Sequence, residues 1–295
     1  MPLHPAIELL NDARTGGYAI GYFESWNLDS LQGVIDAAEE TRSPVITGVN
    51  GEFLSSPERR ADERLPCYAA LLRTAAESAS VPVAIIFNEC AQDDWIREAV
   101  KLGFSQVMLD DPHASLEETA RRARDLARFA HENGAIMEAE VGELPCGASG
   151  RVTENGALTD PDVAATFVEA TGIDVLAVSV GNVHVMVQGQ QGLDIRRLRA
   201  LRRRTDVHLD LHGGTGIPDD SLKDAVAAGV TKVCYGTYLK QRYLGELRRT
   251  LANSSGNPHR LLGMGGSEDV MTAGRLAVRD AVLERIELLG CCGKA

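Results

Sequence analysis

The chain has 295 residues, of which 24% are charged and 44% hydrophobic, as in globular proteins and unlike disordered, collagen-like or coiled-coil chains. Its length fits either two domains or one α/β barrel of roughly 250 residues with additions. Asp and Glu number 42 against 30 Lys and Arg, a formal net charge of −12, which argues against a nucleic-acid partner. The one basic cluster, at 196–204, is predicted to be the solvated face of a helix.

No apolar run reaches 18 residues, and the segment after Met1 has neither the basic nor the apolar part of a secretion signal. We therefore expect a cytoplasmic protein that does not bind a membrane. The six cysteines form no zinc-type Cys-x-x-Cys pair and are predicted to be reduced thiols.

Short β-branched and apolar runs alternate with helical patterns along nearly the whole chain. Helix starts are readable where Ser115 is followed by Glu118 and where Asp160 is followed by Pro161. The connections are helical crossovers, so the strands should be parallel. The eight predicted strands are 18–23, 44–48, 81–87, 106–109, 135–140, 174–180, 207–211 and 231–235.

Eight such units predict an α/β fold of the closed (β/α)8, or TIM, barrel type. An open doubly wound sheet is the alternative, weakened because no Gly-x-Gly-x-x-Gly follows the first strand. We expect one domain over 1–295, with extra C-terminal helices at about 261–295. The glycine-rich stretch 142–160 is predicted to be a mobile loop where an active-site lid would sit.

Polar residues follow several predicted strands, at ends that meet at one mouth of a barrel. They are Glu24, Asn88, Glu89, Glu138, Glu140, His184 and His212. Two imidazoles and nearby carboxylates predict a metal site with nitrogen and oxygen ligands. For either histidine taken alone, a structural role in the core is the alternative.

Two turns have the composition of an anion-binding site. Gly213, Gly214 and Thr215 follow the seventh predicted strand, and Gly236 and Thr237 follow the eighth. Glycines let backbone N–H groups approach an oxyanion, and these two loops form the usual phosphate site of a barrel.

Several segments resemble the class II, metal-dependent fructose-bisphosphate and tagatose-bisphosphate aldolases, in order along essentially the whole chain. These segments are 103–110 (GFSQVMLD), 137–142 (MEAEVG), 176–184 (LAVSVGNVH), 211–216 (LHGGTG) and 289–295 (LGCCGKA). The resemblance implies a TIM barrel and a catalytic divalent metal, usually Zn²⁺. It also implies reversible aldol cleavage of a phosphorylated ketose through a metal-bound enediolate of dihydroxyacetone phosphate, by a homodimer or homotetramer.

Only part of the family's site is matched by residues of this sequence. His184 and His212 match two metal-binding histidines, Glu140 matches a nearby or alternative ligand, and Val185 falls among the substrate-binding positions. The family's catalytic Asp and third His are replaced by Asn88 and Glu89. A His₂Glu set of Glu89, His184 and His212 would leave positions open for substrate or water. An amide at Asn88 cannot exchange a proton as a carboxyl group does.

Other departures from the family surround the same site. Glu24 and Cys234 stand where the family has Asn, and the lid stretch 145–150 lacks its acidic residue, with Glu143 and Glu154 the nearest acids. Cys234 is either a small packing residue or a soft ligand or nucleophile.

Asp210 replaces an apolar residue, and a period of two places it inside the barrel below His212. It would orient that imidazole or act as a base, or else meet an inward Lys or Arg.

These observations favour a divergent metal-dependent carbon–carbon lyase or synthase. It would act on a phosphorylated ketose or a donor of the dihydroxyacetone-phosphate type, with Glu24, Glu89 or Asp210 making displaced proton transfers. The altered residues predict a substrate other than fructose bisphosphate. Two alternatives stay open: an isomerase, epimerase or dehydratase on the same scaffold, and a non-catalytic homologue that binds a sugar phosphate.

Overall fold

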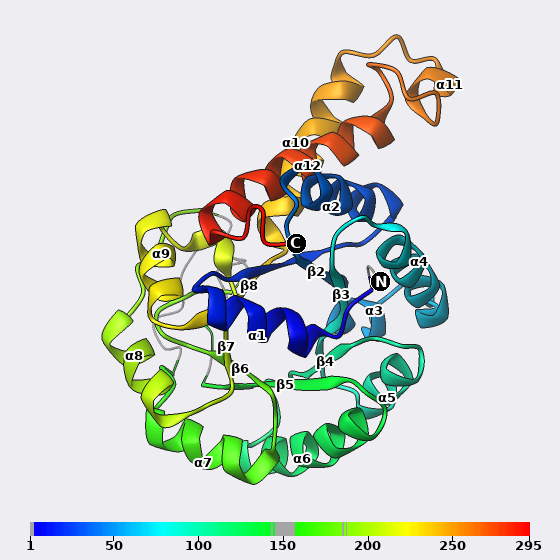
Figure 1. Cartoon of the computed structure of the whole chain (residues 1–295). Coiled ribbons are helices and arrows are strands. Elements are labelled where there is room, and N and C mark those ends of the chain that lie inside the picture. The colour runs from blue at the N-terminus through cyan, green and yellow to red at the C-terminus, as the bar shows by residue number, and fades with distance from the viewer. Residues whose placement is uncertain (1–2, 143, 145–156, 185, 187) are drawn as a thin grey trace.

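The computed structural model of the chain describes residues 3–142, 144, 157–184, 186 and 188–295. Eight parallel strands form a closed barrel in which each strand pairs with the next and the last pairs with the first (Figure 1). The strands are β1 (Ile20–Glu24), β2 (Val45–Asn50), β3 (Val83–Cys90), β4 (Gln106–Leu109), β5 (Ile136–Val141), β6 (Val175–Val178), β7 (His208–Leu211) and β8 (Val230–Tyr235). The predicted closed barrel is confirmed and the open sheet is wrong.

The strand predictions err mainly at their ends. β4 has the predicted bounds, whereas β3 continues past the predicted end at 87 as far as Cys90, which pairs with Leu109 beyond an irregularity in the ladder. This extension places Asn88 and Glu89 inside the strand, at the end where it leaves the barrel.

Helices surround the barrel, and one further helix precedes the first strand. The helices are α1 (Ala6–Gly16), α2 (Leu28–Thr41), α3 (Gly51–Ser55), α4 (Leu65–Ser78), α5 (Asp93–Lys101), α6 (Leu116–Glu132), α7 (Pro161–Thr171), α8 (Ile195–Arg204), α9 (Asp219–Ala227), α10 (Thr237–Ala252), α11 (Pro258–Leu261) and α12 (Val270–Leu289). The predicted helix starts are found: the Ser115 side chain accepts from the Glu118 N–H, and Asp160 accepts from the first turn of α7.

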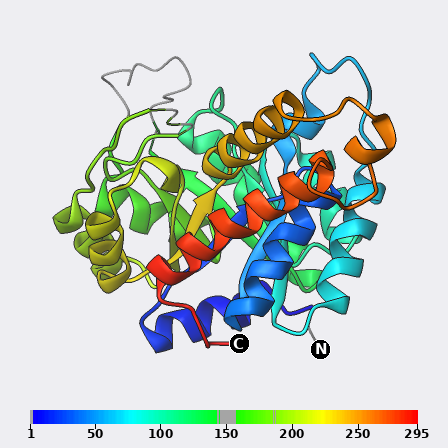
Figure 2. The ribbon, with the colours of Figure 1, turned by 90° about the horizontal axis from the view of Figure 1, so that it is seen from above.

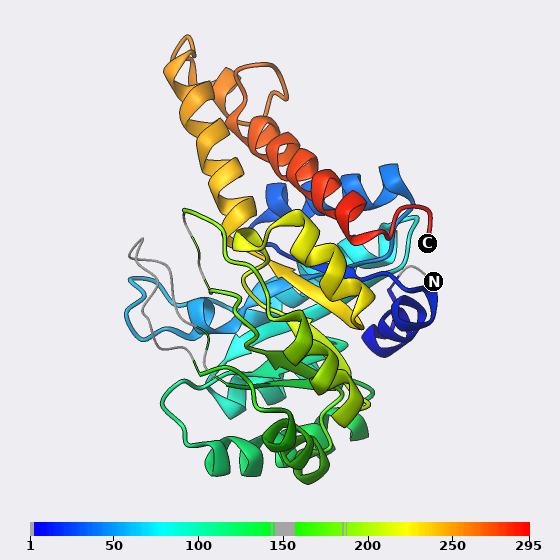
Figure 3. The same cartoon turned by 90° about the vertical axis from the view of Figure 1, so that its left-hand side faces the viewer.

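The C-terminal helices form a pair that projects from the barrel, as Figure 3 shows for α10 and α12. α10 directly follows β8, α11 lies at the start of the predicted C-terminal extension at about 261–295, and α12 lies within it. α12 packs against α2 (Figure 2). Gly33 on α2 allows the two helices to approach closely, because a Cβ at this position would lie 2.5 Å from the carbonyl oxygen of Arg275. The Arg275 guanidinium also pairs with Asp36 across this contact.

The barrel interior is not wholly apolar. Gln106, Glu138, Asp210 and Lys232, from β4, β5, β7 and β8, are fully buried and form a connected set of hydrogen bonds and ion pairs. This polar layer lies directly below the strand ends. Within the described ranges, no helix is long and apolar enough to cross a membrane.

Candidate active site

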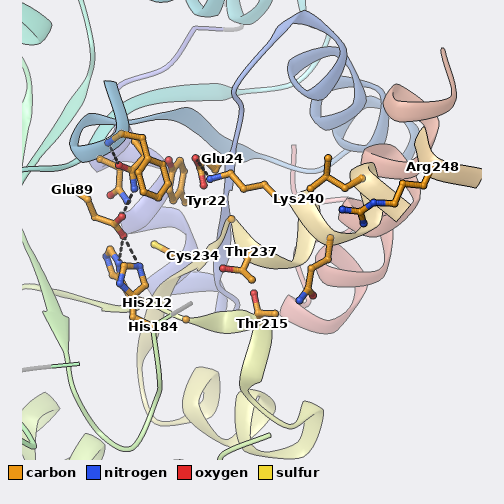
Figure 4. A pocket seen from close by; sticks show the side chains of 17 residues that line it. Tyr22, Glu24, Glu89, His184, His212, Thr215, Cys234, Thr237, Lys240 and Arg248 are labelled. Atoms are coloured by element: carbon orange, nitrogen blue, oxygen red, sulfur yellow. Dashed lines mark hydrogen bonds and ion pairs between the residues drawn. The ribbon is translucent and has the colours of Figure 1, made fainter. Parts of the chain in front are cut away.

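A cavity of about 530 Å³ opens at the carboxyl ends of the strands. Figure 4 shows the side chains around it, which come from the strand ends, from the turns after β7 and β8, and from α10. This is the end of a (β/α)8 barrel at which active sites are found.

Glu89, His184 and His212 meet on the wall of this cavity, with their ligand atoms within 4.8 Å of one another. Oε1 of Glu89 lies 2.6 Å from Nδ1 of His212 and 3.4 Å from Nε2 of His184. Glu89 and His212 are buried, and His184 is partly exposed. The sequence-predicted ligand set is thus brought together by β3 and by the turns after β6 and β7.

The backbone of Glu89 has φ = 50°, in the left-handed region that non-glycine residues rarely adopt. Its side chain accepts from the Nδ2 amide of Asn50 and contacts both histidines, which hold it in this conformation. Burial disfavours the carboxylate, but His184 and His212 outweigh burial and lower the pKa of Glu89 well below its ordinary value. Strained residues of this kind gather at functional sites.

A second group of possible ligands, Asp210, His212 and Cys234, lies deeper in the barrel and shares His212 with the first. Here the Lys232 ammonium lies 3.0 Å from Oδ2 of Asp210 and 2.6 Å from Oε2 of Glu138. A fixed positive charge in this place disfavours a cation beside it. The outer group is therefore the better metal site.

Asp210 meets an inward lysine and also lies against the imidazole. Its Oδ2 atom is 3.1 Å from Nε2 of His212 and accepts from the Cys234 thiol at 3.0 Å. Burial and Asp210 raise the pKa of Cys234 to about 12, so the thiol is neutral at physiological pH. A neutral buried thiol is a poor nucleophile, which favours the packing interpretation of Cys234.

Glu140 belongs to neither group of possible ligands. Burial and the nearby Asp110 carboxyl raise the pKa of Glu140 to about 8, and burial and Glu89 raise the pKa of Asp110 to about 6. Glu140 therefore lies close enough to the cluster to feel its charges, without being part of it in this structure.

The two glycine-rich turns lie side by side because β7 pairs with β8. Gly213 has φ = 70°, and a Cβ on it would lie 2.1 Å from the carbonyl oxygen of Val183. Thr215 accepts from the backbone N–H of Tyr238 at 3.1 Å, which ties the first turn to α10. Gly236 precedes Thr237, the first residue of α10. Val185, the remaining predicted binding residue, lies outside the described residues, as do Glu143, Glu154 and the lid stretch 145–150.

Part of the cavity wall was not predicted from the sequence. Tyr22 on β1, Asn50 at the end of β2, and Lys240, Leu244 and Arg248 on α10 all line the cavity. The last three recur every four residues and so share one face of a helix, a signal that was present in the sequence. Lys240 pairs with Glu24 through an Nζ to Oε1 distance of 2.6 Å.

The closed barrel, with a carboxylate–imidazole cluster and two glycine-rich turns at its carboxyl end, defines an enzyme of the (β/α)8-barrel class. Comparison with known proteins identifies its family. The family model described as "Fructose-bisphosphate aldolase class-II" matches residues 5–294, and the chain belongs to this family.

Individual relatives agree with this assignment. The chain is 30% identical to a probable fructose-bisphosphate aldolase from Bacillus subtilis over the full length of both chains. It is 31% identical to the fructose-bisphosphate aldolase from Geobacillus stearothermophilus, covering 98% of this chain and 97% of the relative. Among solved structures, the YdjI aldolase from Escherichia coli K12 is 31% identical, with a TM-score of 0.82 and 99% of each chain covered. The resemblance drawn from the motifs is confirmed, and the family supports an aldolase-type lyase.

Proposed function

We propose that this chain is a metal-dependent aldolase that makes and breaks a carbon–carbon bond of a phosphorylated ketose, with a donor of the dihydroxyacetone-phosphate type. The observation that carries the proposal is the convergence of Glu89, His184 and His212 at a cavity bordered by two glycine-rich turns.

The ligand set fits a divalent metal, Zn²⁺ above all. Two imidazole nitrogens and one carboxylate are a common set for catalytic zinc, and three protein ligands leave room for substrate. Such an ion would supply Lewis-acid polarisation of a substrate carbonyl. On the protein side, Asp210 accepts from Nε2–H of His212 and so leaves Nδ1 facing Glu89 and the cavity.

The turns after β7 and β8 would hold the phosphate group of the substrate. Backbone N–H groups at Gly213, Gly214 and Thr215 and the N-terminus of the 16-residue helix α10 provide hydrogen-bond donors and a favourable dipole. The Lys240 ammonium adds positive charge to the same cavity, although Glu24 partly neutralises it.

Glu24 is the candidate for the proton transfer that Asn88 cannot make. It lies on the cavity wall, where burial raises its pKa against the opposing effect of Lys240. Asn88 has no acidic proton, so this chain needs another group in that role. The changed pair of Glu24 and Asn88 supports a substrate other than fructose bisphosphate.

Metal analysis of protein purified without chelator or tag metal tests this function. We expect about one metal ion per chain in the unmodified protein and loss of the ion in Glu89→Ala. Glu140→Gln is the matched control, because it removes a nearby carboxylate that belongs to neither ligand group. Protein without metal, or a Glu89→Ala variant that keeps it, would contradict the proposal.

Assembly into a homodimer or homotetramer is proposed from the family resemblance. The end of α10 and the segment between α10 and α12 support it, since they expose Leu251, Leu262 and Met264 to solvent. Sedimentation measurements on the full chain test this, and a monomer at micromolar concentration would contradict it.

A further inference from the structure

Two buried polar atoms on the cavity wall have no hydrogen-bond partner among the residues that the structure describes. They are the hydroxyl oxygen of Tyr22 and Oδ1 of Asn88. The two residues are only 2% and 1% exposed. A buried polar group without a partner costs about 1–3 kcal/mol, so such groups call for an explanation. Because both side chains border the cavity, a bound substrate group is the natural partner.

The two atoms have complementary hydrogen-bonding roles. A phenol donates through its O–H, whereas an amide oxygen only accepts. A sugar hydroxyl satisfies both, since it accepts from Tyr22 and donates to Asn88. An ionised phosphate or carboxylate oxygen has no hydrogen to offer Oδ1 of Asn88. This part of the wall therefore suits a neutral oxygen of the substrate.

The places of these residues in the cavity indicate which oxygen this is. The phosphate-binding turns proposed above follow β7 and β8, and His212 of the cluster directly precedes the first of these turns. Tyr22 and Asn88 come from β1 and β3, and in Figure 4 Tyr22 lies between Glu89 and Glu24. A substrate with its phosphate in the turns and its carbonyl at the cluster presents its following carbons to this wall.

We infer that the Tyr22 hydroxyl donates a hydrogen bond to the oxygen of the aldehyde half of the substrate, on the carbon that joins the donor carbon. The inference rests on the proposed function. In the ketose this oxygen is a hydroxyl, which Asn88 also binds. As the carbon–carbon bond forms from the aldehyde, the carbonyl electrons move onto this oxygen, and the fixed Tyr22 O–H stabilises the developing charge while keeping its own proton. Glu24, the acid proposed above on the same cavity wall, supplies the proton that turns this oxygen into the hydroxyl of the ketose.

This role separates two half-reactions. Exchange of the donor hydrogen of dihydroxyacetone phosphate with solvent involves no aldehyde, so it should not need Tyr22. Formation of the carbon–carbon bond does. Removal of one donor that stabilises a developing oxyanion lowers the rate by about 10²–10³-fold in other enzymes.

The chain offers a matched control. Tyr235 is also fully buried, and its hydroxyl has no hydrogen-bond partner in the described part of the chain, but it is not among the described residues that line the cavity. Tyr22→Phe and Tyr235→Phe therefore remove the same atom from two buried rings. Neither change breaks a hydrogen bond seen in the structure, so both variants should fold with melting temperatures close to that of the unmodified protein.

The experiment uses the metal-loaded full chain and both variants. Deuterium exchange into dihydroxyacetone phosphate is followed by NMR, and condensation of this donor is measured with glyceraldehyde 3-phosphate and with glyceraldehyde. We expect Tyr22→Phe to keep exchange within about twofold and to lose condensation by about 10²-fold or more. Tyr235→Phe should change neither rate.

Equal loss of exchange and condensation in Tyr22→Phe would show a structural role and overturn the inference. Unchanged condensation would overturn it as well. An unmodified protein that shows no exchange, or no condensation with either aldehyde, would overturn the proposed function, and the inference would fail with it. The two failures are therefore distinguishable.

Discussion

Asp210 lies directly against His212 below the floor of the cavity, with its Oδ2 atom 3.1 Å from Nε2 of the imidazole. The same oxygen is 3.0 Å from the Lys232 ammonium, and the side chains of Asp210 and Lys232 are both fully buried. Lys232 thus balances the charge of Asp210, and Asp210 accepts from Nε2–H of His212, which would leave Nδ1 to bind a metal ion. The imidazole presents its other nitrogen to Glu89.

We predict that Asp210→Asn weakens metal binding by about 10–100-fold, the range found when a group that orients a metal-binding histidine is lost. The amide offers its own N–H to Nε2, which favours the tautomer with hydrogen on Nδ1 and so blocks the nitrogen that faces Glu89. Competition with a chromophoric chelator measures the affinity. Metal affinity equal to that of the unmodified protein would show that Asp210 does not set the tautomer.

Much of this site could be predicted from sequence, because the strand ends of a barrel converge regardless of the conformation of the loops. That ground alone predicts that Glu89, His184 and His212 meet at one mouth of the barrel, whereas the choice of Glu89 as the third ligand comes from the family resemblance. Lys232 was missed: β8 is buried along its whole length, so its apolar pattern does not distinguish the inner from the outer face. Counting back two residues from Cys234 would have placed Lys232 inside, opposite Asp210.

The wall contributed by Tyr22 and α10 was also missed, for a different reason. A tyrosine in an apolar strand is typical of a core residue, and only the structure shows that its hydroxyl has no partner among the described residues. The packing of α12 against α2 includes a close approach at Gly33, a long-range contact that no local pattern predicts. Helix ends such as those at Ser115 and Asp160 were predicted because capping is local.

His208 makes folding stability depend on pH. Burial, with smaller effects of Arg14 and Arg202, lowers its pKa to about 3, while its ring contacts Asn11 and Thr231. The unfolded chain, with an ordinary histidine pKa of about 6.5, therefore binds one more proton between these values. The contribution of neutral His208 is fully present above about pH 6.5 and is lost as pH falls toward 3.

We predict that His208→Gln, which can still bond to Asn11 and Thr231, reduces this acid sensitivity. Denaturant unfolding at several pH values from 7 to 4 gives the free energy of unfolding of both proteins. The difference between them should change with pH by up to about 1.4 kcal/mol per unit, the value for one proton. A difference that does not vary with pH would mean that His208 titrates alike in the folded and unfolded chains.

Gly33 should be intolerant of a larger residue because α12 lies so close. A Cβ there would meet the Arg275 carbonyl at 2.5 Å, and backbone of a packed helix cannot move aside cheaply. We predict that Gly33→Ala lowers the free energy of unfolding by about 1–3 kcal/mol. Gly245→Ala on α10 is the control, since its Cβ would meet no described atom within 4 Å and alanine favours helix by about 1 kcal/mol. Equal melting temperatures for the two variants would contradict the packing argument.

Alanine substitutions at Gly213 and Gly17 separate the cost of a left-handed backbone from the cost of a steric clash at the proposed phosphate turn. The φ of Gly213, 70°, nearly equals the 67° of Gly17, which directly follows α1. Of the two, only Gly213 would place a Cβ in a clash, 2.1 Å from the Val183 carbonyl oxygen. Alanine at either position costs about 1–2 kcal/mol for the left-handed backbone. We predict that Gly213→Ala alone also displaces the turn and weakens binding of inorganic phosphate by at least about tenfold, a loss of roughly 1.4 kcal/mol. Calorimetric titration of both variants measures this, and unaltered phosphate affinity in Gly213→Ala would place the phosphate elsewhere in the cavity.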